Sequence, residues 1–274
     1  MPAPRSIVEL ILGGTLDAEL AAQLWLLLEA GVPVVVAGAA PAVGTSTLLG
    51  AVLAFLPGEV RVVVLAGDGE TFDWMPQATE LGWPGVARAR KGIPPARPGE
   101  TLLLADGLSD QGKADTWGEA ARVAVRAASI GYGLAATIPA DSLDEVLHLL
   151  GQPPVRLADD ELTHLGVVLV LRRLDDGRRR VAAAHYVRPL ARDTHGHLQR
   201  LGPAVLATWD PAADRFEHFG WGITPELAAR VGRRAGDFEV ERERRRTLLE
   251  DLAGAGRTAP DEVRRALLAD RSSV

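Results

Sequence analysis

The sequence predicts an α/β fold with a mainly parallel sheet, followed by a C-terminal part built of β-hairpins and helices. In the first half of the chain, short apolar runs rich in valine alternate with amphipathic helical patterns. That alternation is typical of βαβ units, whose strands pair in parallel. After Pro153-Pro154 the apolar runs come in pairs joined by short polar turns, which is typical of antiparallel hairpins.

The elements follow in order. A short apolar segment at 6–11 precedes a helix that begins near Ala18, because Asp17 can cap it and leucines recur at helical spacing. Continuous, largely β-branched runs predict buried strands at residues 32–36, 61–65, 101–105 and 134–138. Further helices are expected at residues 46–56, 117–129 and 142–150, and an irregular stretch at 72–100.

The second half predicts two hairpins and a helical end. The hairpins pair 165–172 with 180–187 and 205–209 with 215–219, and helices follow from Thr224. The charge run at 239–246 predicts a solvated helix face. We expect a core domain at residues 6–190 and a hairpin and helical appendage at residues 191–274.

The composition of the chain excludes several classes of site and partner. The chain has 274 residues, a formal net charge of -6 and no cysteine. The missing cysteines exclude disulfides and thiolate metal sites, and the acidic charge argues against a nucleic-acid partner. No apolar run reaches the ~20 residues of a membrane span, and no signal-peptide pattern opens the sequence. We therefore expect a cytoplasmic protein, with His195 and His197 solvated rather than bound to metal.

A glycine-containing loop between the first buried strand and the next helix is the strongest candidate site. Free N–H groups at a helix N-terminus favour phosphate. In the phosphate-loop motif a lysine and a hydroxyl residue follow the second glycine. Here Gly38 and Gly44 are spaced one residue too far apart, and Thr45 stands where the lysine belongs, while Ser46 and Thr47 keep the hydroxyls. An ordinary strand-to-helix turn is the alternative interpretation.

Three carboxylates follow neighbouring strands. Asp106 comes directly after the run at 101–105, where a carboxylate beside a phosphate loop holds Mg²⁺ or orients water. Asp68 and Glu70 follow the run at 61–65, where they can hold a metal or activate water. A loop cap explains Asp106 equally well, and a solvated turn explains the other two.

Several segments between residues 6 and 187 resemble, in order and spacing, the motor ATPases of type II secretion, type IV pilus assembly and archaeal-type secretion. These segments are Glu9-Leu10-Ile11, Gly14-Thr15-Leu16, Thr47-Leu48-Leu49, Phe55-Leu56-Pro57, Arg97-Pro98, 127–142 and Arg179-Arg180-Val181.

The resemblance implies a RecA-like P-loop NTPase fold that binds ATP and Mg²⁺. It implies catalytic roles for Asp106 and Glu70 and metal binding by Ser46 and Asp106. The implied nucleotide-binding residues are Gly38, Gly44, Thr45, Ser46, Thr47 and Asp68. It also implies a homo- or hetero-oligomer that works with secretion or pilus machinery at the inner face of the membrane.

The departures from the family fall at catalytic positions. The family has lysine in place of Thr45, glutamate in place of Asp106, and histidines in place of Tyr132 and Pro139, and its N-terminal domain has no counterpart here. A missing lysine removes a contact worth ~1.5–3 kcal/mol to phosphate binding. We therefore expect a degenerate motor ATPase homologue with weak or lost hydrolysis. The alternative is a non-catalytic structural subunit or regulator that assembles with an active motor.

Overall fold

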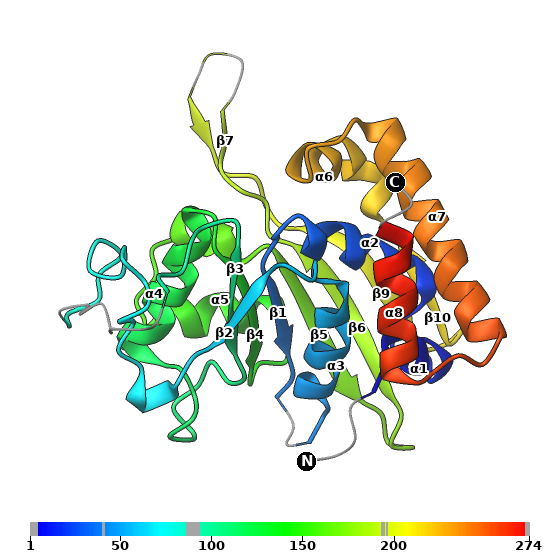
Figure 1. The fold of residues 1–274 in the computed structure, drawn as a ribbon, viewed down its shortest axis with the longest axis horizontal. Coiled ribbons are helices and arrows are strands. Elements are labelled where there is room, and N and C mark those ends of the chain that lie inside the picture. Colours follow the sequence, from blue (N-terminus) through cyan, green and yellow to red (C-terminus); the bar gives the residue numbers. More distant parts are fainter. Residues whose placement is uncertain (1–4, 40–41, 86–93, 193–194, 196, 272–274) are drawn as a thin grey trace.

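The computed structural model describes residues 5–39, 42–85, 94–192, 195 and 197–271. Within them, one eight-stranded sheet has the order β10-β9-β6-β5-β1-β4-β3-β2 (Figure 1). The strands from β5 to β2 are parallel, and β6, β9 and β10 are antiparallel to their neighbours. The strands of this sheet are β1 (Val34–Ala37), β2 (Arg61–Val64), β3 (Thr101–Ala105), β4 (Gly133–Ile138), β5 (Val167–Arg173), β6 (Arg179–Tyr186), β9 (Ala204–Asp210) and β10 (Arg215–His218).

The four strands predicted from apolar runs are confirmed as β1 to β4, and they lie in one parallel arrangement. The prediction that the second of them is buried is wrong, because β2 is the edge strand and its Val62 and Val64 are exposed. Strand β1 is central, with Val34 opposite Ala135 of β4 on one side and Val167 of β5 on the other. It begins two residues later than predicted. Pro33 has no N–H to donate, and only its carbonyl takes part, accepting a hydrogen bond from the Val167 N–H at 2.8 Å.

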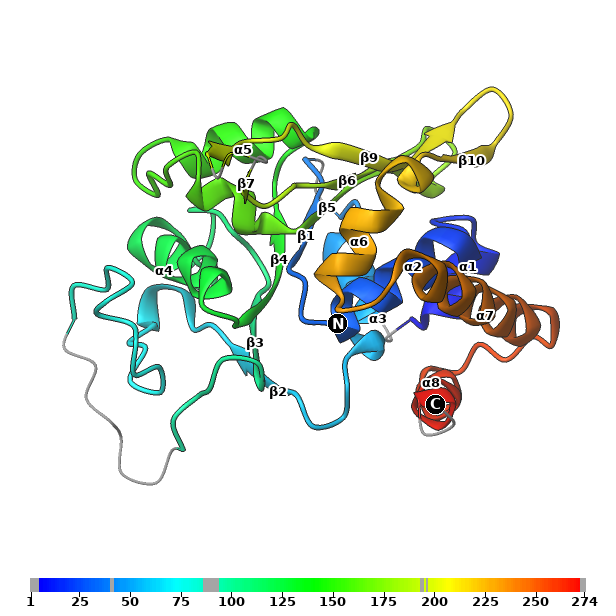
Figure 2. The ribbon, with the colours of Figure 1, turned by 90° about the horizontal axis from the view of Figure 1, so that it is seen from above.

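Helices cover both faces of the sheet, as Figure 2 shows. Alternate residues of β1 face opposite ways, so Val34 and Val36 join the core beneath α1, α2 and α3, while Val35 and Ala37 join the core beneath α4 and α5. The helices are α1 (Ile7–Leu12), α2 (Ala18–Glu29), α3 (Thr45–Val52), α4 (Gly118–Ser129), α5 (Leu143–Gly151), α6 (Thr224–Arg230), α7 (Ala235–Gly254) and α8 (Pro260–Arg271).

Local signals set several helix boundaries. The Asp17 carboxylate accepts a hydrogen bond from the Leu20 N–H at 2.9 Å and caps α2, as predicted. Helix α3 is shorter than predicted, because a 3₁₀ turn over Leu53–Phe55 replaces its end. In the described part of the chain, no helix combines the length and apolar character that crossing a membrane requires.

Both predicted hairpins are confirmed, but the second one lies in the main sheet. Strand β9 pairs with β6, so the β9–β10 hairpin extends the sheet of the preceding residues. The expected boundary between residues 190 and 191 falls between β6 and β7. A two-stranded hairpin, β7 (Ala191–Arg192) and β8 (Leu198–Gln199), projects from that connection (Figure 1).

The prediction of a solvated face at 239–246 is wrong for two residues of α7. Glu241 and Arg245 are only 6% and 3% exposed. Arg245 donates to Glu241 at 2.9 Å, bonds Glu29 of α2, and lies 4.5 Å from the centre of the Trp25 ring. Because α7 packs against α2, positions four residues apart on α7 face inward together.

Candidate functional site

The candidate site lies at the carboxyl ends of β1, β4 and β3. Strand β1 leads into α3 on one face of the sheet, and β4 leads into α5 on the other. Neighbouring parallel strands whose connections leave toward opposite faces open a crevice between their ends, where ligands bind in α/β sheets. The predicted loop follows β1 and Asp106 follows β3. Ala40 and Pro41 of that loop lie outside the described residues.

The structure brings two of the predicted site residues into contact. The Ser46 hydroxyl donates a hydrogen bond to the Asp106 carboxylate at 2.7 Å, across 60 residues of sequence. Ser46 lies in the first turn of α3, and Asp106 comes directly after β3. Both side chains are exposed. A hydroxyl and a carboxylate oxygen are hard ligands of the kind that Mg²⁺ takes.

The start of α3 presents unused backbone donors beside this pair. Gly44 is the N-cap of α3, with φ 102°, and no side chain caps the helix. The N–H groups of Val43, Gly44 and Thr45 donate no hydrogen bond to any other described residue. Such groups, with the positive end of the helix dipole, make an N-terminus attractive to anions.

The beginning of the loop is closely packed. The Gly38 N–H donates to the Ile138 carbonyl at 3.0 Å and so continues the pairing of β1 with β4. A Cβ at Gly38 would lie 2.5 Å from a methyl of Val43 and 2.7 Å from the methyl of Thr45. Only glycine fits there. The two methyl groups cover the backbone at this end of the loop, and Thr45 supplies no cation.

An arginine from a distant strand contacts the loop instead. Arg179, the first residue of β6, donates from Nε to the Val43 carbonyl at 2.8 Å and from Nη2 to the Ala42 carbonyl at 3.3 Å. With Gly44 and Thr47 it lines a hollow of about 490 Å³. The sequence analysis placed Arg179 only in a segment of the resemblance. The cluster of three arginines at 178–180 was the available signal, but it did not reveal the partner.

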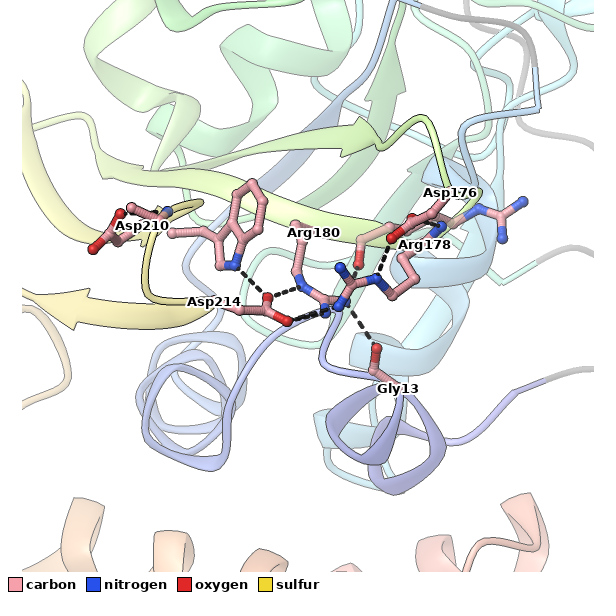
Figure 3. A network of polar contacts seen from close by, with 9 residues as sticks. Gly13, Asp176, Arg178, Arg180, Asp210 and Asp214 are labelled. Carbon is pink, nitrogen blue, oxygen red and sulfur yellow. Dashed lines mark hydrogen bonds and ion pairs between the residues drawn. The ribbon is translucent and has the colours of Figure 1, made fainter.

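The residues on either side of Arg179, Arg178 and Arg180, belong to a polar network that Figure 3 shows. Asp214, in the β9–β10 turn, accepts hydrogen bonds from Arg180 at 3.1 Å, from Arg178 at 2.7 Å and from the Trp209 indole at 3.0 Å. These bonds, led by that of Arg180, hold the pKa of the Asp214 carboxyl well below its usual range. Arg180 is buried and also donates to the Gly13 carbonyl at 2.9 Å.

Glu70 is engaged within its own loop. Its carboxylate accepts hydrogen bonds from the N–H groups of Ala66, Thr71 and Phe72 at 3.0, 2.9 and 2.7 Å, and from the Trp74 indole at 3.2 Å. The side chain is buried. These four bonds shape the loop after β2, a structural role that the sequence analysis did not predict.

Asp68 lines a hollow that neither Ser46 nor Asp106 lines. Its N–H donates to the Lys113 carbonyl at 3.0 Å, and its exposed side chain lines a hollow of about 440 Å³. Ser109 and Asp115 line the same hollow, whereas neither member of the pair does. The structure therefore places Asp68 in a hollow that does not include the loop it was expected to join.

Tyr132 and Pro139, which stand where the motor ATPases that the sequence resembles have histidines, are separated by the length of β4. Tyr132 is buried at the amino end of β4, with its hydroxyl 2.9 Å from Gln77 Oε1 and 3.0 Å from the Ala96 carbonyl. Burial raises its pKa. Pro139 follows the opposite, carboxyl end. The rings of His195 and His197 are 6.2 Å apart, and the described residues contain no group of three or more side chains suited to hold a metal.

Comparison with known proteins finds a distant relative, and no family model matches the chain. The chain is similar to uncharacterized protein MJ0900 of Methanocaldococcus jannaschii, at 25% identity over 261 residues. The similarity covers 91% of this chain and 46% of that protein, so the chain spans about half the length of the curated relative it matches. Because that relative is itself uncharacterized, it brings no activity to this chain.

Proposed function

We propose that this chain is a RecA-like P-loop domain, homologous to the motor ATPases of secretion and pilus assembly. It binds ATP with Mg²⁺ at the loop after β1, and its hydrolytic activity is weak or lost. The observation that carries the proposal is the hydrogen bond between Ser46 and Asp106 at 2.7 Å. It joins the first turn of the helix after β1 to the carboxylate after β3, a parallel strand that is separated from β1 by β4. Phosphate-loop enzymes use a hydroxyl and a carboxylate at those two places.

The side chains at the pair suit Mg²⁺. Ser46 and Asp106 offer two oxygen atoms at an exposed position, and Mg²⁺ keeps several waters and the substrate's phosphate oxygens as its other ligands. When bound, the ion would neutralise charge on the phosphates. The role of Asp106 in this proposal is to supply the negative charge, and that of Ser46 is to orient the carboxylate.

The residues that would contact the phosphates of ATP suit them only in part. The N–H groups at the start of α3 support an anion there. Thr45 brings no positive charge to the β- and γ-phosphates, however, and its methyl covers the backbone of Gly38. Removing a donor aimed at transition-state charge typically lowers a rate by ~10²–10³. Weak binding and little turnover follow from this combination.

The resemblance to motor ATPases over residues 6–187 also supports a cellular location and a set of partners for the chain. We propose that it acts on the cytoplasmic side, at the inner face of the membrane, as a subunit of a homo- or hetero-oligomer with secretion or pilus machinery. A formal net charge of -6 argues against nucleic acid as its cargo.

A titration with a fluorescent ATP analogue, with and without Mg²⁺, tests the function. We expect weak binding that Mg²⁺ strengthens, and we expect Ser46→Ala and Asp106→Asn to remove the effect of Mg²⁺. Asp68→Asn is the matched control, because it removes the same charge in a separate hollow. Absence of any nucleotide binding would favour the alternative of a non-catalytic structural subunit. Brisk ATP hydrolysis that Asp106→Ala abolishes would instead identify an active motor.

A further inference from the structure

We infer that Arg179 is a positioning residue that holds the loop after β1 in the conformation that receives phosphate. The inference rests on the proposed nucleotide site. In it, Arg179 acts by bonding the loop backbone and does not contact the nucleotide. One guanidinium bonds two successive carbonyls, those of Ala42 and Val43, at 3.3 and 2.8 Å.

Those two bonds fix the direction of two N–H groups. A trans peptide group is planar, and its N–H points opposite to its C=O. The carbonyls of Ala42 and Val43 both point toward β6, so the N–H groups of Val43 and Gly44 both point away from it. Neither N–H donates to another described residue. Two neighbouring N–H groups that face the same way are the elements of an anion-binding nest.

The backbone conformation agrees with this arrangement and needs outside support. Ala42 has φ 56° and Gly44 has φ 102°, while Val43 between them does not share this left-handed conformation. Such alternation is what brings successive N–H groups to one side. An alanine in the left-handed region is strained, and strain of this kind persists only where surrounding contacts fix it. Arg179 supplies a contact on each of the two peptide groups that follow the strained residue.

Arg179 itself is held firmly. The residues on either side of it, Arg178 and Arg180, both donate to Asp214 (Figure 3). Arg180 also donates to the Arg179 carbonyl at 3.1 Å. The β9–β10 hairpin thereby fixes the start of β6 and, through Arg179, the loop. Because the guanidinium lies on the carbonyl side of the loop, it does not take the place of the missing lysine against the phosphates.

Two variants and a matched control test this role. Arg179→Gln removes the double donor, and Arg179→Lys keeps the charge and one donor direction. Arg173→Gln is the control, because Arg173 is exposed, lies directly across β5–β6 from Arg179, and makes no hydrogen bond to the loop among the described residues. The measurements are affinity for the fluorescent ATP analogue, hydrogen exchange in the peptide that contains residues 42–48, and melting temperature.

We expect Arg179→Gln to weaken nucleotide binding by about tenfold, the effect of losing one to two hydrogen bonds that orient the loop. Exchange at 42–48 should rise while exchange elsewhere and the melting temperature stay near those of the parent. Arg179→Lys should recover part of both effects, and Arg173→Gln should show neither. A purely structural arginine would not give affinity loss and partial lysine rescue at constant global stability.

The outcomes separate the two proposals. If the parent chain binds ATP but Arg179→Gln leaves affinity and loop exchange unchanged, the role of Arg179 is overturned and the nucleotide site stands. If the parent binds no ATP, the proposed function fails, and loop exchange still decides whether Arg179 holds the loop. Should Arg179→Gln unfold, exchange and affinity in the folded Arg179→Lys variant decide, and parent-like values there contradict the inference.

Discussion

Placing a lysine at position 45 should tighten ATP binding by about one to two orders of magnitude. Thr45 is the first residue of α3, directly after the Gly44 cap, and is half-buried. A lysine there can extend past the helix N-terminus, where free N–H groups and the dipole already favour phosphate.

The magnitude follows from the kind of contact restored. A charge-assisted hydrogen bond contributes ~1.5–3 kcal/mol. At about 1.4 kcal/mol for each factor of ten, that is roughly 10- to 150-fold in Kd. Hydrolysis should stay low, because Asp106, Tyr132 and Pro139 also differ from the residues of the motor ATPases that the sequence resembles.

Calorimetric titration of ATP with Mg²⁺ measures the change, with Thr47→Lys as control. Thr47 is also half-buried in the first turn of α3, but it lines the hollow beside Arg5, Arg178 and Arg179. A lysine there adds the same charge on the β6 side and should tighten binding by much less. The reasoning is refuted if folded Thr45→Lys binds ATP no better than the parent, or if both lysines act equally.

Three stability predictions concern other parts of the fold. Burial would lower the pKa of His218, but its hydrogen bond to Asp17 at 2.7 Å and nearby carboxylate charge raise it. The pair therefore stabilises the fold below the ordinary histidine pKa of about 6.5, and this contribution is lost as the pH rises through the folded value. His218→Gln should lower the melting temperature more at about pH 5.5 than at about pH 8.5, and an equal loss would contradict this. Arg245→Met should lower the free energy of unfolding in urea by about 1.5–3 kcal/mol, because it removes charge-assisted hydrogen bonds to Glu241 and Glu29, which keep Arg244 and Arg271 as partners. A loss below about 1 kcal/mol would mean that Arg245 contributes no more than a surface ion pair. Gly38→Ala should lower the free energy of unfolding by about 1–3 kcal/mol, because the new Cβ would lie 2.5 Å from a methyl of Val43. Gly50→Ala should raise the free energy of unfolding by about 0.5–1 kcal/mol, since an added Cβ there meets nothing within 4 Å. Changes in melting temperature of the same sign for both glycine variants would refute the argument.

Local patterns in the sequence determined the type and order of most elements. Short apolar runs identified β1 to β4, because strand residues that face a core need apolar side chains. Asp17 marked the start of α2, since a cap acts on N–H groups only a few residues away. The Gly44 cap and the position of Asp106 at a strand end were visible for the same reason. Each of these signals depends on neighbours in the chain.

The tertiary structure alone decided which distant residues meet. It placed the Ser46 hydroxyl on Asp106, and it placed Asp68 in a hollow that neither of them lines. The direction in which a connection leaves the sheet depends on which face its helix covers, and residue spacing does not encode that.

The same reason explains why features of the C-terminal part were not predicted. The sequence predicted a hairpin but not that β9 would pair with β6, and it predicted a charged helix face but not that α2 would bury Arg245 of α7. Nor did any local pattern connect Arg179 with a loop 136 residues earlier. A strand edge, an amphipathic helix or an arginine could pair with several other segments of the same chain at similar energy. The packing of the whole sheet, which satisfies all of them at once, selects one.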